Sequence, residues 1–277
     1  MTLSVDASTL ADVAGSLART VGRVIHSKRA IGVDVAATKS SLSDVVTAAD
    51  QEAERLLTEG LLRHRPDDAI LGEEGASIAG TTGITWVVDP IDGTVNYLYN
   101  IPAYAVSVAA TVEDGAPGTM SDGRRAIAGA VYLPVTGELF TAWEGGGAFL
   151  DGKRLSGPAE SELGTTLLAT GFGYTVERRT EQVEVLRHVL PRVRDIRRMG
   201  SAATDLCMLA AGRVDAYYER GLQPWDYAAA TLIAREAGAT VRGLGEAAPG
   251  EEMLIAGTPA VTAELAAIVA EAYRTLA

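Results

Sequence analysis

The chain has 277 residues, of which 47% are hydrophobic, enough for a sizeable core in one large domain or two closely packed ones. Its formal net charge of −12 argues against nucleic acid and anionic lipid as partners, and no apolar run approaches the roughly 18 residues of a membrane span. With one cysteine, three scattered histidines and no signal-peptide pattern at its start, the chain is expected to be cytoplasmic and to lack both an intramolecular disulfide and a zinc cluster.

The first half of the chain is predicted to contain two helices followed by a series of strands. Apolar residues at helical spacing predict an amphipathic helix over residues 5–30 and a second over 48–62, which Thr47 is placed to cap. Short apolar runs bounded by turn residues predict strands at 69–71, 86–88, 104–112, 126–134, 138–143 and 148–150. Antiparallel-type strands between helices indicate an α+β or mixed α/β fold and not a doubly wound parallel sheet.

The composition turns polar at residues 156–163, and we place a boundary there between an N-terminal half, residues 1–155, and a C-terminal half, residues 156–277. In the second half strands alternate with helices, as in an α/β layer. The strands are expected at 167–170, 214–218, 240–242 and 253–256, and the helices at 180–189, 202–211, 226–237 and 260–277.

The stretch Trp86–Thr94 carries the clearest chemical signal. Its apolar start, Trp86–Val88, is typical of a strand buried on both faces. Pro90 lacks an amide donor and favours extended geometry at Asp89, so we expect the strand's ladder to stop there. Asp89 and Asp92 would then lie close together on a turn, where a divalent cation relieves their repulsion and gains the hard oxygen ligands that Mg²⁺ prefers.

Gly93 and Thr94 are expected to open a helix, whose first backbone amides are unpaired and attract an anion. A carboxylate-bound metal beside such a helix start favours the hydrolysis of a phosphate ester. The alternative is that Asp-Pro-Ile-Asp-Gly forms only a turn, because each of these residues is turn-prone.

Further acids stand where predicted strands end or predicted helices begin: Asp50, Glu73, Glu74, Glu219 and Asp226. Taken singly, each has an ordinary explanation. Asp226 suits a helix cap, Asp50 a favourable position on the helix dipole, and Glu219 a solvated strand end. Taken together, carboxylates from several chain segments are what a multinuclear Mg²⁺ site requires.

These motifs resemble the signatures of the inositol monophosphatase family. Asp-Pro-Ile-Asp-Gly-Thr-Val-Asn-Tyr at 89–97 is similar to the first signature, and Trp-Asp-Tyr-Ala-Ala-Ala at 225–230, with Glu-Ala-Gly-Ala at 236–239, to the second. Segments 44–50 and 72–74 match the family in order and spacing, and the resemblance runs from about residue 11 to the C-terminus. It implies a layered αβαβα sandwich with the site between the two halves of the chain.

The resemblance also implies a cofactor of two or three Mg²⁺ ions. A first ion would be held by Glu73, Asp89 and the backbone carbonyl of Ile91. A second would be held by Asp89, Asp92 and Asp226, with Asp89 as the bridging ligand. A third, weaker ion would use Glu73 and water molecules.

The catalytic residues that the resemblance implies are Thr94, Asp50 and Glu73. Thr94 and Asp50 would orient the attacking water on the first metal, which fits elementary chemistry: a threonine hydroxyl that accepts a hydrogen bond needs an acceptor for its own proton, and Asp50 supplies one. The metal makes the water more acidic and stabilises the departing alkoxide, so no covalent enzyme intermediate is needed.

The substrate contacts that the resemblance implies are Lys39, on a mobile loop, and Asp92, Gly93, Thr94, Ala202 and Glu219. The amides of Gly93 and Thr94 would hold phosphate oxygens, while Glu219 would accept hydrogen bonds from sugar hydroxyls. Val-Asn-Tyr at 95–97 and Tyr-Tyr-Glu at 217–219 are close to the pattern of inositol phosphatases.

We therefore expect an enzyme that hydrolyses myo-inositol monophosphate, is inhibited by Li⁺ and forms a homodimer. Two departures from the family pattern bear on substrate choice: Gly173 stands where proline is common, and Gln223 occupies a variable position at the rim. The alternatives are a broad-specificity phosphatase that acts on fructose 1,6-bisphosphate or histidinol phosphate, and a regulatory binding protein that keeps this fold without catalysis.

Overall fold

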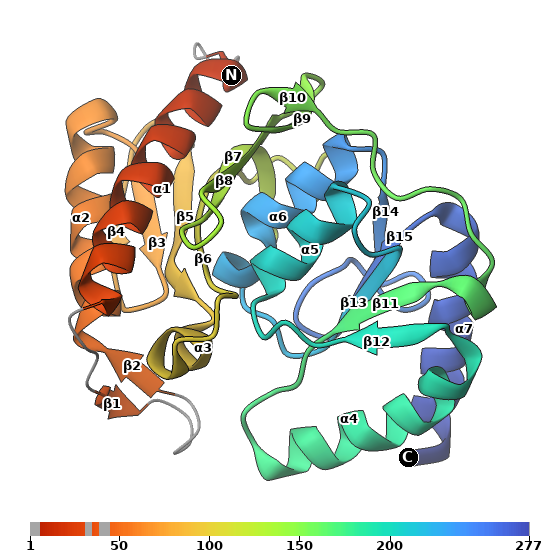
Figure 1. The fold of residues 1–277 in the computed structure, drawn as a ribbon. Coiled ribbons are helices and arrows are strands. Elements are labelled where there is room, and N and C mark those ends of the chain that lie inside the picture. Colours follow the sequence, from red (N-terminus) through yellow and green to blue (C-terminus); the bar gives the residue numbers. More distant parts are fainter. Residues whose placement is uncertain (1–5, 31–34, 39–44, 277) are drawn as a thin grey trace.

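The computed structural model describes residues 6–30, 35–38 and 45–276, which fold into alternating layers of helices and sheets (Figure 1). The helices are α1 (Ala7–Arg29), α2 (Ala48–His64), α3 (Thr94–Tyr99), α4 (Val176–Val189), α5 (Ala202–Ala210), α6 (Pro224–Glu236) and α7 (Pro259–Leu276). Helices α1 and α2 cover the outer face of one sheet, α5 and α6 lie between two sheets, and α4 and α7 cover the outer face of the second. The expected αβαβα sandwich is confirmed.

The first sheet has the strand order β10-β9-β8-β7-β6-β5-β3-β4. Its strands are β3 (Ala69–Gly72), β4 (Ser77–Ile78), β5 (Thr85–Asp92), β6 (Ala105–Val112), β7 (Arg125–Leu133), β8 (Glu138–Trp143), β9 (Gly147–Leu150) and β10 (Lys153–Arg154). All neighbours pair antiparallel except β3 and β5, which are parallel. The two carboxyl ends of this parallel pair therefore meet at one edge, and both carry candidate metal ligands.

The second sheet has the order β12-β11-β13-β15-β14. Its strands are β11 (Leu167–Thr170), β12 (Asp195–Arg197), β13 (Ala216–Glu219), β14 (Thr240–Arg242) and β15 (Leu254–Gly257). Strands β12, β11 and β13 are parallel, whereas β15 runs antiparallel to both β13 and β14. A separate antiparallel pair joins β1 (Val35–Thr38) to β2 (Val45–Thr47), and two short 3₁₀ helices occur at Leu163–Thr165 and Leu190–Arg192. The division of the chain at residues 155 and 156 stays a prediction.

Strand β5 is buried on both faces, as its apolar sequence predicts. Trp86 and Val88 pack in the core between the first sheet and α1 and α2, while Val87 points the other way, into the core that contains α5 and α6. Alternate side chains of one strand thus serve two cores, which is the period-two pattern of a central strand. Burial of this kind holds the end of β5, and with it the candidate site, in a fixed position.

Helix α6 packs closely against the first sheet at a point where the contacting residues are small. A Cβ added to Gly129 of β7 would lie 3.1 Å from the Cβ of Ala229. This close approach requires glycine on the strand and alanine on the helix. It brings the first turn of α6 beside the end of β5.

The strand β5 does not stop at Pro90, so that prediction is wrong. Asp89 pairs with Ser107 and Asp92 pairs with Ala105, which leaves Pro90 and Ile91 opposite the single residue between those partners. This two-against-one arrangement is a β-bulge, where a residue without an amide donor costs no ladder hydrogen bond. The bulge lets the strand continue to Asp92.

Other boundaries differ from the predictions by a few residues. Helix α4 begins at Val176, four residues before the expected start at 180, because Thr175 caps it by accepting a hydrogen bond from the amide of Arg178. Helix α6 begins at Pro224, which suits the first turn of a helix where its missing N–H would be unpaired in any case.

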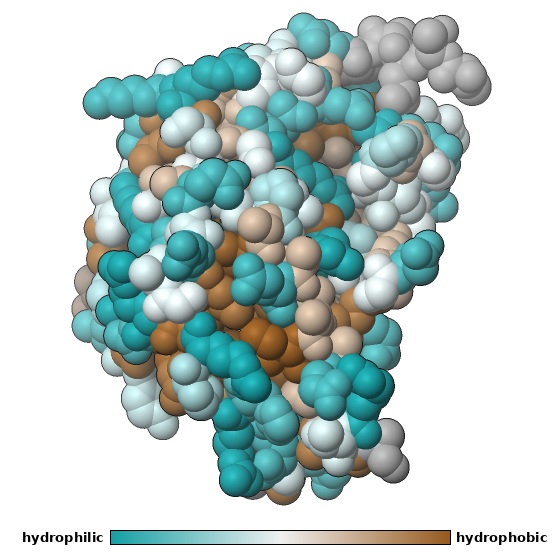
Figure 2. All heavy atoms as spheres, turned by 90° about the vertical axis from the view of Figure 1, so that its right-hand side faces the viewer, coloured by the Kyte–Doolittle hydropathy of each residue, from teal (hydrophilic) through white to brown (hydrophobic). Residues whose placement is uncertain are grey.

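The side of the molecule on which α7 lies is hydrophilic at its edges and has an apolar area near its centre (Figure 2). Among the described residues, no helix is long and apolar enough to cross a membrane.

Candidate active site

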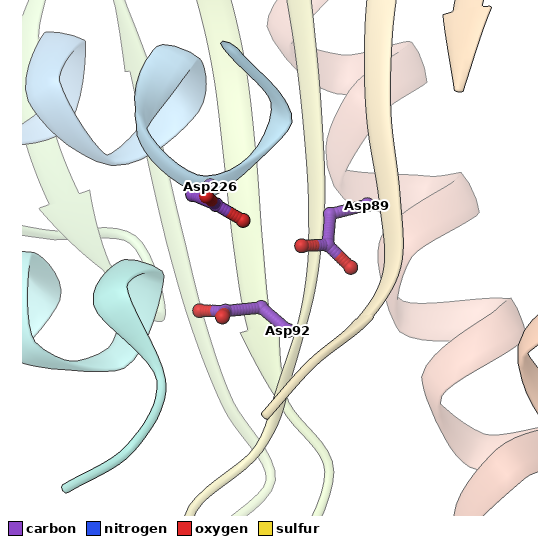
Figure 3. Close-up of side chains that lie close together, drawn as sticks. All are labelled: Asp89, Asp92 and Asp226. Atoms are coloured by element: carbon purple, nitrogen blue, oxygen red, sulfur yellow. The ribbon is translucent and has the colours of Figure 1, made fainter. Parts of the chain in front are cut away.

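Three aspartates meet where the end of β5 approaches the start of α6 (Figure 3). Asp89 and Asp92 come from the strand and Asp226 comes from the helix's first turn. One oxygen atom of each carboxyl group lies within 4.8 Å of the others. Asp89 and Asp92 are only 1% and 8% exposed. Segments more than 130 residues apart in the sequence therefore supply one compact group of carboxylate oxygens.

Main-chain and hydroxyl donors hold these carboxyl groups in place. Oδ2 of Asp92 accepts hydrogen bonds from Ser201 Oγ at 2.6 Å and from the amide of Ala203 at 2.7 Å. Oδ2 of Asp226 accepts one from the amide of Gln223 at 2.6 Å, and Oδ1 of Asp89 accepts one from the amide of Ile91 at 3.0 Å. The orientation of each side chain is thus set by the backbone of an element end.

Burial raises the pKa of each of the three aspartates, and repulsion from neighbouring carboxylates raises the pKa of Asp89 and Asp226 further. For Asp89, burial is the largest cause, and the charges of Glu73, Asp92 and Asp226 raise the pKa further. Burial is also the largest cause for Asp92 and Asp226. Closely spaced buried carboxylates are stabilised either by protons or by a cation. Because all the donor atoms are hard oxygens, the group suits Mg²⁺ better than a soft metal.

Glu73 follows β3, directly beside this group, and lines the same cavity as Asp89. A side-chain hydrogen bond links the two acids and contributes to the raised pKa of Asp89. The Glu73 carboxyl thus adds a fourth carboxyl group to the donor set, from the strand that pairs in parallel with β5.

Glu54 on α2 clamps the turn that carries Glu73, a role that sequence reasoning missed. Its two carboxylate oxygens accept hydrogen bonds from the amides of Glu74 at 2.7 Å and Ala76 at 2.9 Å. A Cβ on Gly72 would lie 2.2 Å from Oε2 of Glu54, so glycine is needed for this approach. The available signal was an acid on the buried face of a helix, four residues after Asp50.

Thr94 and Asp50 form a hydrogen-bonded pair next to the aspartates. Thr94 Oγ1 lies 3.1 Å from Oδ1 of Asp50 and 3.0 Å from the carbonyl oxygen of Ile91, so its hydroxyl proton has two acceptors. Oδ2 of Asp50 accepts hydrogen bonds from the amide and the hydroxyl of Thr47, which closes a capping box at the start of α2. Burial raises the pKa of Asp50 to about 6, against the lowering effect of these hydrogen bonds.

Gly93 precedes α3 with a φ of 95°, a left-handed conformation that favours glycine. A Cβ at this position would lie 3.0 Å from the carbonyl oxygen of Ala103 and 3.1 Å from that of Gly200. The expected helix start at Gly93 and Thr94 is confirmed. Gly93 allows the chain to turn sharply from β5 into α3 beside the carboxylates.

A cavity of about 500 Å³ joins these residues to the second sheet. Of the residues singled out from the sequence, those that line it are Glu73, Asp89, Ile91, Asp92, Gly93, Thr94, Gly173, Ala202, Glu219, Gln223 and Asp226. Asp50 lies behind Thr94 and reaches the cavity through that hydroxyl. Lys39 lies outside the described residues.

Glu219, at the end of β13, forms part of the cavity wall. Tyr217 donates a hydrogen bond from its hydroxyl to Oε2 of Glu219 at 2.7 Å. Burial raises the pKa of Glu219 to about 7, while this hydrogen bond and the charge of Arg198 act in the opposite direction. A carboxyl group held in this way can accept hydrogen bonds from hydroxyl groups in the cavity.

Sequence reasoning also missed Ser201, Arg178 and Arg198. Ser201 caps α5 and donates to Asp92, and a serine directly before a helical run was a readable sign of the cap. Arg178 and Arg198 line the cavity. Arg198 ends a basic stretch, residues 187–198, whose composition is typical of a solvated surface, and no pattern marked Arg178.

The chain resembles known proteins over nearly its whole length. A family model described as the inositol monophosphatase family matches residues 6–275. Inositol-1-monophosphatase SuhB of Mycobacterium tuberculosis is 48% identical over 239 residues, which cover 83% of this chain and 79% of the relative. Nus factor SuhB of Escherichia coli is 38% identical, with 83% of each chain covered. The crystal structure of extragenic suppressor protein suhB from Bartonella henselae superposes with a TM-score of 0.85 at 33% identity, covering 94% of this chain and 98% of that one.

Proposed function

This chain belongs to the inositol monophosphatase family, and from that premise we propose that it hydrolyses myo-inositol monophosphate to inositol and phosphate with Mg²⁺ as cofactor. One observation carries the proposal. The three aspartates, whose carboxylate oxygens lie within 4.8 Å of one another, share a cavity with Thr94 and with a wall acid, Glu219. A metal group, a residue that orients water and an acceptor for sugar hydroxyls are the three parts that the reaction requires.

The proposed ligands divide into two overlapping sets. Glu73, Asp89 and the carbonyl oxygen of Ile91 would hold one ion, and Asp89, Asp92 and Asp226 a second, with a third ion at Glu73 as a weaker option. When bound, Mg²⁺ supplies Lewis-acid chemistry, which makes water more acidic and stabilises negative charge on the phosphate and the departing alkoxide. The raised pKa values of the aspartates support this assignment, because bound cations would replace the protons that the buried group otherwise retains.

Thr94 is proposed to orient the attacking water. Its hydroxyl oxygen accepts a hydrogen bond from that water while its own proton is donated to Oδ1 of Asp50, 3.1 Å away. Because Thr47 holds Oδ2 of Asp50 through two hydrogen bonds, the carboxyl group stays aimed at Thr94. The pair thus fixes the direction of attack without itself taking a covalent part.

The phosphate and the sugar are proposed to bind on opposite sides of the cavity. The amides of Gly93 and Thr94 would donate to phosphate oxygens, at the turn that only glycine can form. The Asp92 carboxyl and the backbone at Ala202 would contact ring hydroxyls, together with Glu219 on the wall. Lys39 is proposed to approach the substrate from its loop.

We further propose that the enzyme is a cytoplasmic homodimer, that Li⁺ inhibits it at the second metal position, and that its partner is a small phosphate ester and neither nucleic acid nor membrane. A second candidate is a regulatory binding protein that keeps this fold without catalysis. The relative from Escherichia coli is named Nus factor SuhB, a name that does not describe a phosphatase. The complete set of Asp50, Glu73, Asp89, Asp92, Thr94 and Asp226 favours catalysis here, since a chain without catalytic constraint would be free to lose ligands.

Phosphate release with Mg²⁺ tests the proposal on a panel of inositol 1-phosphate, fructose 1,6-bisphosphate, histidinol phosphate and adenosine 3′,5′-bisphosphate. The expected result is a preference for inositol 1-phosphate that Li⁺ suppresses. Preference for another ester would keep the metal assignment and overturn the inositol one. Release from none of them would favour the binding protein.

A further inference from the structure

Strand β13 carries two tyrosines in succession, and their side chains point to opposite faces of the second sheet. Tyr217 packs in the core that contains α5 and α6, whereas Tyr218 packs in the core that contains α4 and α7. Because side chains alternate along a strand, Tyr217 shares its face with Glu219, which ends β13 in the cavity wall. The strand thus places one tyrosine beside the wall acid and turns the other away from it.

The hydroxyl group of Tyr217 is committed to Glu219. It donates to Oε2 of that residue at 2.7 Å, and within the part of the chain that the structure describes it makes this hydrogen bond alone. The tyrosine is 0% exposed, so packing fixes its ring and with it the direction of the donor. One oxygen atom of the wall acid is therefore held by a rigid partner from its own strand.

Gly171, which follows β11, gives the carboxyl group of Glu219 its space. The parallel register that pairs Thr170 with Tyr218 brings the next residues of the two strands, Gly171 and Glu219, side by side. A Cβ on Gly171 would lie 2.0 Å from Oε2 and 2.2 Å from both Cδ and Oε1 of Glu219. The carboxyl group thus occupies the volume that any larger residue would fill, and it is confined by the neighbouring strand as well as by Tyr217.

This arrangement divides the work of the two carboxylate oxygens of Glu219. Oε2 is taken by Tyr217, whereas none of the hydrogen bonds among the described residues ends at Oε1. The bond from Tyr217 also favours the ionised form, because it acts against the rise in pKa that burial causes. An ionised carboxyl group only accepts hydrogen bonds, so Oε1 remains for a hydroxyl group of a ligand in the cavity.

We propose that Tyr217 is a positioning residue for substrate selection, which holds one oxygen of Glu219 and leaves the other for a hydroxyl group of the sugar. The inference rests on the proposed function, in which Glu219 contacts the ring hydroxyls. Tyr217 is buried behind the wall and acts through Glu219. Its effect should therefore be confined to esters whose hydroxyl groups Glu219 can contact.

Steady-state kinetics with Mg²⁺ test this role on two esters, inositol 1-phosphate and p-nitrophenyl phosphate, whose ring carries no hydroxyl group. Tyr217→Phe removes the donor and keeps the ring. Tyr218→Phe is the matched control, because it removes the same atom from the neighbouring buried tyrosine, whose side chain faces the other core. Hydrolysis of p-nitrophenyl phosphate by each variant reports that the fold and the metal centre are intact.

We expect Tyr217→Phe to lower the ratio of kcat/KM for inositol 1-phosphate to kcat/KM for p-nitrophenyl phosphate by about tenfold, through the KM of the inositol ester, with kcat changed by less than about twofold. Tyr218→Phe should leave the ratio unchanged. In a Glu219→Ala background, Tyr217→Phe should lower the ratio no further, because two residues that act as a unit are not additive.

Three results would overturn the positioning role while inositol hydrolysis stands: an unchanged ratio in Tyr217→Phe, an equal loss on both esters, or a further fall of the ratio in the Glu219→Ala background. A wild-type enzyme that prefers a different hydroxylated ester, such as fructose 1,6-bisphosphate, and loses that preference in Tyr217→Phe would support the positioning role and overturn the proposed function. A wild-type enzyme that prefers no hydroxylated ester would overturn both.

Discussion

The floor and the wall of the cavity are built in different ways. The floor consists of Asp89, Asp92 and Asp226, which come from a buried strand end and a helix start and are held by backbone amides. The wall, with Glu219 and Arg178, comes from the ends of elements around the second sheet and is held by side chains such as Gln182 and Tyr217. The residues of the floor are held by the backbone of buried elements, so moving them would disturb the core. The wall is held by side chains, so single substitutions can change its shape and charge. We infer that the floor determines the chemistry and the wall determines the substrate.

The largest effect should come from breaking the floor. Asp89→Asn should lower turnover by about a thousandfold or more, because it removes the ligand proposed to bridge two cations. In the presence of a chelator, the variant should have a higher melting temperature than the wild type, because asparagine mimics the protonated form of Asp89 that burial favours. Phosphate release and thermal unfolding with and without Mg²⁺ measure both effects. Asp67→Asn, in an exposed turn, is the control. Near-normal turnover in Asp89→Asn would contradict the two-metal scheme.

The next largest effect should come from loosening one support of the floor. Glu54→Gln weakens the clamp on the turn that carries Glu73, and we expect Mg²⁺ affinity to fall by about 10–100-fold, as when outer partners of metal ligands are removed. Isothermal titration calorimetry measures the affinity directly. Glu59→Gln on the exposed face of the same helix is the matched control. Equal affinities in the two variants would show that the clamp does not act on the metal.

The buried carboxyl group of Glu219 in the wall should make the free energy of unfolding depend on pH. The pKa of Glu219 rises from 4.5 to about 7 on folding, so between these values the folded state binds more protons than the unfolded state. The free energy of unfolding contributed by this group is therefore intact below about pH 4.5 and lost as pH rises through about 7, by roughly 3 kcal/mol. Urea unfolding in chelator at pH 5 and pH 8 measures the loss. Glu219→Gln should flatten this part of the profile, and an unchanged slope would contradict the assignment.

The smallest effect on turnover is expected at Ser201, which caps α5 and also donates a hydrogen bond to Asp92. Ser201→Ala removes the cap of α5 and one hydrogen bond to Asp92, which should lower the free energy of unfolding by about 1 kcal/mol. The amide of Ala203 still holds Asp92, so turnover should fall by less than about tenfold. Denaturant unfolding and phosphate release measure the two quantities. A collapse of turnover would show that the serine hydroxyl, and not the backbone, orients the aspartate.

Much of the fold could be predicted because its signals are local. The apolar periodicity of α1, the cap at Thr47 and the buried run of β5 each lie within one segment, and the structure confirms them. The candidate floor was also readable, because Asp89 and Asp92 lie in one short motif and Asp226 opens a helix.

What could not be predicted depends on contacts between distant segments. The bulge at Pro90 is decided by the pairing of β5 with β6, so the sequence of β5 alone predicted a strand end. The clamp by Glu54 joins residues 20 and 22 positions apart, and the bond from Ser201 to Asp92 spans 109 positions. The position of Arg178 on the cavity wall depends on Gly173 in the loop before α4, where a Cβ would lie 2.7 Å from Cγ of the arginine. The order and spacing of residues along the chain do not show which distant segments come into contact.

The most direct test of the central claim is the anomalous scattering of Mn²⁺ in crystals of the wild-type protein soaked with Mn²⁺ and phosphate. We expect at least two anomalous peaks, both with Asp89 as a ligand, one shared with Glu73 and the Ile91 carbonyl and one with Asp92 and Asp226. Peaks elsewhere, or no peak between these carboxylates, would contradict the assignment of this group as the metal centre.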